Sequence, residues 1–118
     1  MTQNERKKRI TEVIKDCGIS ANLSGYHYLR EAIDLTLSDF EYVQRITKLL
    51  YPAVAKKYNT TPSRAERGIR HAIETGWIRA DLEFLNELFG NSLPVDKCKP
   101  TNSEFIATLA DYIALNED

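Results

Sequence analysis

Residues 50–73 read LYPAVAKKYNTTPSRAERGIRHAI, and this stretch decides the fold. Three residues near its centre end one helix and begin another. Asn59 belongs to a residue type that readily adopts the left-handed conformation that ends a helix. Thr61 is a good N-cap, and Pro62 then falls at the first helical position, where proline is tolerated. The pattern predicts a short helix, a tight turn and a longer helix over residues 62–79, which is the layout of a helix-turn-helix.

Both segments carry an apolar face at helical spacing. The first helix places Val54 and Tyr58 toward the core. In the second helix the apolar face holds Ala65, Ile69, Ala72, Ile73 and Trp77. The opposite face is polar and consists of Ser63, Glu66, Arg67, Arg70 and Glu74, with Arg64 and His71 along its flank. The longer helix is therefore expected to pack through one side and expose an arginine-rich side.

An exposed helix face with arginines near its N-terminus suits the major groove of DNA. Arg can bond guanine O6 and N7 bidentately, and Glu can accept a hydrogen bond from cytosine N4. The backbone amides near Ser63, together with Lys56 and Lys57, could hold phosphate groups. The same arginine face is also compatible with a solvated surface that binds nothing. On these residues alone, both hypotheses, DNA binding and a solvated surface, stay open.

The rest of the chain is also helical in pattern. Apolar positions recur three and four residues apart, and alternation with a period of two is nearly absent. We predict an all-α protein, a compact bundle of about six helices forming one domain over residues 1–118, with residues 1–8 flexible. The first helix is expected to end at Gly18 and the second to begin at Ser24 or Gly25. A short third helix should run from Phe40 to Thr47 after a cap at Ser38-Asp39. After the central stretch we expect a helix that begins at Asp81 and ends at Gly90, a loop over 91–100, and a last helix that begins with a capping box at Thr101–Glu104.

Composition adds a charge asymmetry that the net charge of -1 conceals. Residues 44–79 hold eight basic and two acidic side chains, whereas residues 80–118 hold two lysines and eight acids. A basic middle next to an acidic tail hints at a polyanionic partner. The competing hypothesis is a helical protein-interaction module that uses the acidic half, 80–118, against a basic partner.

Several function classes find no support in the sequence. Cys17 and Cys98 lie far apart and form no metal-like cluster, and neither His27 nor His71 has a second ligand at metal-binding spacing. We expect no metal and no cofactor. No apolar run approaches the roughly 18 residues of a membrane span, and no signal peptide opens the chain. No catalytic triad or phosphate-binding glycine loop emerges, so we expect no enzyme activity and a cytoplasmic protein.

Three segments carry a resemblance to a known family: GYHYLREAI at 25–33, ITKLLYPAVAKKYNTTPSRAERGIRHAIE at 46–74 and KPTNSEFIATLAD at 99–111. The chain resembles the C-terminal DNA-binding effector domain of the stage-zero sporulation response regulator, the master transcription factor of endospore formation. The similarity runs from about residue 10 to residue 115. It implies an all-helical domain of about six helices with a helix-turn-helix that binds a TGTCGAA-type promoter box, often as head-to-tail pairs on tandem boxes.

The resemblance also implies roles for particular residues. The base-reading positions would be Arg64, Glu66 and Arg67, and the positions that help to hold the DNA would be Ser63, Arg70 and His71. The region Asp81 to Phe89 resembles the surface that contacts the RNA polymerase sigma factor, and the candidate contact residues are Asp81, Glu83, Phe84 and Glu87. The last helix, around Ala110, resembles the dimer-forming region.

This chain departs from the family pattern at a few places. The family usually has alanine-like residues where this sequence has Pro62, Gly68 and Gly76, and residues 78–98 diverge. We expect the two glycines to loosen the recognition helix and to lower its affinity for DNA. The family's phosphorylated receiver domain is absent, so we expect either an excised effector domain or a stand-alone relative that binds DNA constitutively.

Overall fold

The computed structural model describes residues 1–90 and 99–116, and these form helices joined by short loops. The elements are α1 (Gln3–Asp16), α2 (Ser24–Ser38), α3 (Glu41–Gln44), the π-helical segment η1 (Ile46–Leu50), α4 (Tyr51–Lys57), α5 (Pro62–Arg79), α6 (Leu82–Phe89) and α7 (Asn102–Leu115). No strand occurs in the described part of the chain. The expected all-α class is confirmed, with seven α-helices within residues 1–90 and 99–116 where we expected about six.

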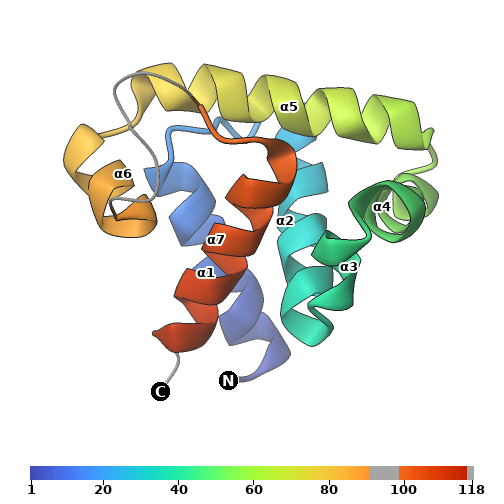
Figure 1. The fold of residues 1–118 in the computed structure, drawn as a ribbon, viewed down its shortest axis with the longest axis horizontal. Coiled ribbons are helices and arrows are strands. Elements are labelled where there is room, and N and C mark those ends of the chain that lie inside the picture. The colour runs from blue at the N-terminus through green and yellow to red at the C-terminus, as the bar shows by residue number, and fades with distance from the viewer. Residues whose placement is uncertain (91–98, 117–118) are drawn as a thin grey trace.

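The recognition helix of the expected motif, α5, lies across one end of the bundle (Figure 1). Helices α1, α2 and α7 run away from it, α4 lies near its N-terminal end and α6 near its C-terminal end. Both chain termini lie at the opposite end of the molecule. The radius of gyration is 13.2 Å, which is typical of a folded domain of this length. The long side of α5 that faces away from α1, α2 and α7 carries no other helix of the described residues (Figure 1).

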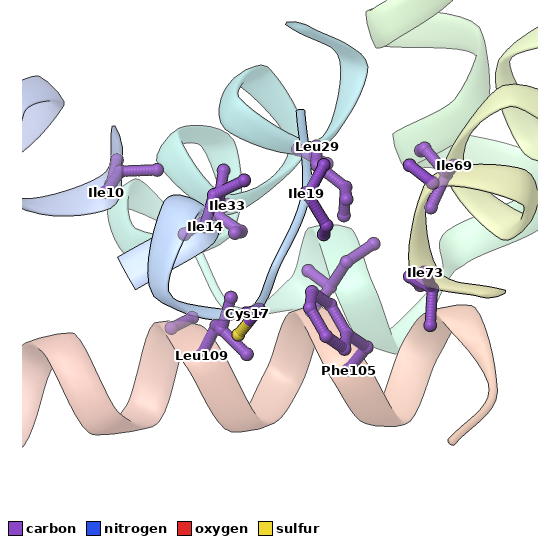
Figure 2. Packing of buried hydrophobic residues seen from close by; sticks show 14 of the residues in the cluster. Ile10, Ile14, Cys17, Ile19, Leu29, Ile33, Ile69, Ile73, Phe105 and Leu109 are labelled. Carbon is purple, nitrogen blue, oxygen red and sulfur yellow. The ribbon is translucent and has the colours of Figure 1, made fainter. Parts of the chain in front are cut away.

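The core is built around α2, which packs against α1, α5 and α7. Its residues Leu29 and Ile33 are fully buried and lie among side chains from these three helices (Figure 2). The fully buried partners include Ile10 and Ile14 from α1, Ile69 and Ile73 from α5, and Phe105 and Leu109 from α7. Burial of one such side chain contributes roughly 1.5–3 kcal/mol. The recognition helix is thus anchored to the centre of the domain.

Two boundaries differ from the sequence expectation. Helix α1 begins at Gln3, where Thr2 and Glu5 form a capping box with two bonds of 3.1 Å. Residues 3–8, which we expected to be flexible, are therefore helical in the structure. The expected third helix is divided, because Arg45 has a non-helical φ of -118° and the chain then continues as a π-helical segment into α4. Local periodicity does not distinguish these two helical forms.

Other local features agree with the sequence. Cys17 is buried at the end of α1, and burial raises the pKa of its thiol to about 12. Thr101 and Glu104 form the predicted capping box of α7. Most of the expected loop at 91–100, with Cys98, lies outside the described residues. Within the described residues, no helix is both long enough and apolar enough to cross a lipid bilayer.

Candidate nucleic-acid interface

The turn between α4 and α5 forms as its sequence predicts. Asn59 has a φ of 53°, in the left-handed region, and the Thr60 amide donates to the Ala55 carbonyl at 2.9 Å. The Thr61 hydroxyl accepts a hydrogen bond from the Arg64 amide at 3.2 Å and so caps α5. Pro62 occupies the first helical position, where no backbone donor is needed. Local chemistry alone therefore sets the start of the recognition helix.

The inner face of α5 packs against α2 at backbone distance. A Cβ atom on Gly25 would lie 2.0 Å from the Gly68 carbonyl oxygen, and a Cβ on Gly68 would lie 2.9 Å from the Tyr28 ring. Farther along α5, a Cβ on Gly76 would lie 2.6 Å from the Cys17 carbonyl oxygen. These glycines permit close packing of α5, a role that we did not expect from the sequence.

The outer face of α5 carries the expected DNA-contacting residues in accessible positions. Five of them are exposed: Ser63, Arg64, Arg67, Arg70 and His71. The side chains of Arg64 and Arg67 form no ion pair or hydrogen bond with any residue in 1–90 or 99–116. Each guanidinium group has five N–H donors, and no residue in these two ranges uses them. With respect to the described residues, both groups are therefore available to an external acceptor.

Glu66 and Arg70 form a hydrogen-bonded ion pair one turn apart on α5. The Arg70 Nε donates to Glu66 Oε2 at 2.9 Å, and Nη2 donates to Oε1 at 3.4 Å. The hydrogen bond to Glu66 raises the pKa of Arg70. Because its carboxylate is bonded to Arg70, the Glu66 side chain is already engaged in the protein without DNA. The spacing of four residues could have indicated this pair.

The two lysines of α4 differ in their surroundings. Lys56 is exposed and has no ion-pair partner among the described residues. Lys57 donates to Glu31 of α2 at 2.7 Å, and its ammonium group lies 5.8 Å from the centre of the Tyr58 ring. The hydrogen bond to Glu31 raises the pKa of Lys57. Lys56 is thus the freer of the two to contact a phosphate.

The expected sigma-factor residues lie on and beside α6. Asp81 caps this helix by accepting a hydrogen bond from the Glu83 amide at 3.0 Å. Phe84 is half-buried and packs edge-on against Tyr112 of α7, whereas Glu83 and Glu87 are exposed. Asp81 and Phe84 therefore have structural roles in addition to any contact with a partner.

The implied dimer-forming residue of α7 faces inward. Ala110 is only 2% exposed, so its side chain belongs to the core of the domain. Any contact that α7 makes with a second copy in this conformation would use exposed neighbours such as Asp111 and Ala114.

Sequence reasoning missed one polar residue beside the recognition helix. Asn102 bonds to Tyr51 of α4 and to the Glu66 backbone of α5, although we considered it only as part of a capping box. No local signal could have revealed these contacts, because the partners lie 51 and 36 residues away in sequence. With Lys99 and Arg70, these residues line an open cavity of about 290 Å³.

The family assignment rests on a match over most of the chain. Residues 10–113 match the family described as Sporulation initiation factor Spo0A C terminal. The chain belongs to this family. It is a DNA-binding effector domain of the sporulation response regulator type, and its helix-turn-helix is α4, the turn at Tyr58–Thr61 and α5. The resemblance found in the sequence is thereby confirmed over nearly its whole extent.

Proposed function

We propose that α5 reads a TGTCGAA-type promoter box from the major groove, with Arg64, Glu66 and Arg67 at the bases. The observation that carries this proposal is the position of the two arginines. They project from the first two turns of a helix that lies across one end of the molecule, and they have no partner among the described residues. Arginine in this setting recognises guanine through two hydrogen bonds.

Contacts to the DNA backbone would come from both helices of the motif. Lys56, Ser63 and His71 are exposed and would contact phosphates directly. Lys57 and Arg70 would first share or exchange their carboxylate partners, Glu31 and Glu66. In that exchange Glu66 would gain freedom to accept a hydrogen bond from cytosine.

Further partners follow from the family and from the charge distribution. The surface that contacts the RNA polymerase sigma factor would comprise Asp81, Glu83, Phe84 and Glu87. Two copies of the domain would bind tandem boxes head to tail. The domain would act in the bacterial cytoplasm as one unit over residues 1–118.

Fluorescence anisotropy with a duplex carrying a TGTCGAA box, compared with a scrambled duplex at two salt concentrations, tests the proposal. We expect a clear preference for the box and an affinity that falls steeply as salt rises, because phosphate contacts release counterions. Equal affinity for both duplexes would contradict base reading and leave a nonspecific basic surface. Absence of binding to either would favour the alternative, a helical protein-interaction module that uses its acidic C-terminal half.

A further inference from the structure

Asn102 connects both helices of the helix-turn-helix to α7. Its side-chain amide nitrogen donates one hydrogen bond to the Tyr51 hydroxyl at 2.9 Å and another to the Glu66 carbonyl oxygen at 3.2 Å. An asparagine side chain has two N–H donors, so both are used. Tyr51 is the first residue of α4, Glu66 lies in the second turn of α5, and Asn102 is the first residue of α7. One side chain thus holds three helices at a single point.

The bond to Glu66 lies where the position of α5 matters most. A backbone carbonyl has two lone pairs, so the Glu66 oxygen can accept from Asn102 in addition to its bond within the helix. Glu66 directly precedes Arg67 and lies two residues after Arg64. A directional bond at this carbonyl therefore limits both rotation of α5 about its axis and sliding along it, at the turn that presents the two arginines.

The packing of α5 explains why such a bond is needed. Where it passes Gly25 of α2, the helix presents the small residues Gly68 and Ala72, which bring the two helices together at backbone distance. Small residues form low ridges, and helix packing is fixed by ridges that enter grooves. At this point the contact is smooth, which allows close approach but resists rotation weakly, whereas Ile69 and Ile73 anchor the helix farther along. The polar bond from Asn102 supplies a direction at the N-terminal turns that the small residues do not.

The other end of the connection is firmly held. Tyr51 is 8% exposed, and burial raises the pKa of its phenol, so the hydroxyl remains protonated near neutral pH. Its ring is fixed in the core, and its oxygen gives Asn102 a stationary acceptor. Asn102 lines the open cavity together with Glu66 and Arg70, which form the ion pair on the recognition helix. Loss of the amide would leave the Glu66 carbonyl within reach of water.

We propose that Asn102 is a positioning residue for base reading, which holds α5 in the rotation at which Arg64 and Arg67 meet their bases. This inference rests on the proposed function of α5. Asn102 itself does not touch DNA in this role. Its removal should therefore impair the distinction between sequences more than the general attraction to DNA.

Two variants test this, each compared with wild type on the TGTCGAA-box duplex and on the scrambled duplex. Asn102→Ala removes both bonds. Asn102→Asp keeps the side-chain shape, removes both donors and places a carboxylate in the first turn of α7, where the helix dipole favours it and folding is retained. The measured quantities are the ratio of the two dissociation constants, the salt slope on the scrambled duplex and the melting temperature.

We expect the ratio to fall about tenfold in both variants, which is within the discrimination that one good base contact provides. The salt slope on the scrambled duplex should stay at the wild-type value, because the basic side chains remain on the surface. The control is Ile113→Val, which removes one methyl group from a fully buried position of α7. This variant should lower the melting temperature and keep the wild-type ratio.

A wild-type ratio in Asn102→Asp would overturn the positioning role, even if Asn102→Ala failed to fold. An equal loss of discrimination in Ile113→Val would also overturn it, since general destabilisation would then explain the result. A wild-type protein that does not distinguish the two duplexes would instead refute the proposed function, and the inference with it. The result for the wild type therefore tests base reading by α5, and the results for the variants test the positioning role of Asn102.

Discussion

The two faces of α5 are built on opposite principles. On the inner face, Gly68 and Gly76 bring the helix to backbone distance from α2 and from the loop after α1, with no room for a further carbon atom. On the outer face, Arg64 and Arg67 extend into solvent without a partner among the described residues. The inner face determines where the helix lies, and the outer face determines what it can bind.

This difference separates two kinds of mutational effect. A change on the inner face has to displace backbone, so it should lower the free energy of unfolding and affect DNA binding only through the fold. A change on the outer face removes a side chain from solvent, so it should weaken DNA binding and leave stability unchanged. The following predictions test this separation.

The largest effect is expected for Gly25→Ala in α2, opposite the inner face. Its new Cβ atom would lie 2.0 Å from the Gly68 carbonyl oxygen and 2.8 Å from the Ala72 Cβ, so the two helices must move apart. We expect a loss of about 3 kcal/mol in the free energy of unfolding, at the upper end for overpacked cores. Urea denaturation measures this, with the exposed neighbour Ser24→Ala as the matched control. Equal midpoints for the two variants would contradict the close contact between α2 and α5.

The second-largest effect is expected for a substitution on the outer face of α5. Arg67→Ala should weaken binding to the TGTCGAA box by about 1–3 kcal/mol, because one bidentate base contact is lost. Its melting temperature should remain that of the wild type. The control is Arg79→Ala, which removes the same charge from the far end of the same helix. If both variants lost affinity equally, Arg67 would act through its charge alone, and its assignment as a base reader would be wrong.

The smallest effect distinguishes the two lysines of α4. Lys56→Ala should weaken binding to all sequences alike and reduce the salt slope by about one, because one phosphate contact is removed. Lys57→Ala should change the slope less, since the charge of Lys57 is already balanced by Glu31 at 2.7 Å. Anisotropy titrations at several salt concentrations give both slopes. A larger change for Lys57 would show that DNA displaces the Glu31 carboxylate at little cost.

Much of this architecture could be predicted because its signals are local. The bounds of α5 agree with the prediction, since Thr61 and Pro62 act within one turn of the residues that they cap. The end of α6 at Gly90, which has a φ of 59°, has the same origin. The arginine face of α5 was likewise predictable, because helical periodicity alone places Arg64 and Arg67 on the side opposite Ile69.

The start of α1 and the division of the third helix were not predicted. At the N-terminus, the capping box of Thr2 and Glu5 was overlooked among polar residues that lack an apolar stripe. At Ile46–Leu50, the apolar spacing fits an α-helix and a π-helical segment almost equally well. The structural role of Gly68 was also missed, because helix propensity describes an isolated helix and takes no account of a neighbouring backbone.

Caps, turns and periodicity depend on residues a few positions apart, so the amino-acid sequence was enough to predict most of the helices, the turn of the helix-turn-helix and the family of the domain. Which cations have a partner depends instead on how the helices pack together. The tertiary structure paired Lys57 with Glu31 across 26 residues and connected Asn102 to Glu66 across 36, while Lys56, Arg64 and Arg67 kept no partner among the described residues. Ion pairs and hydrogen bonds between distant segments depend on the packing of whole helices, and no local pattern encodes that packing.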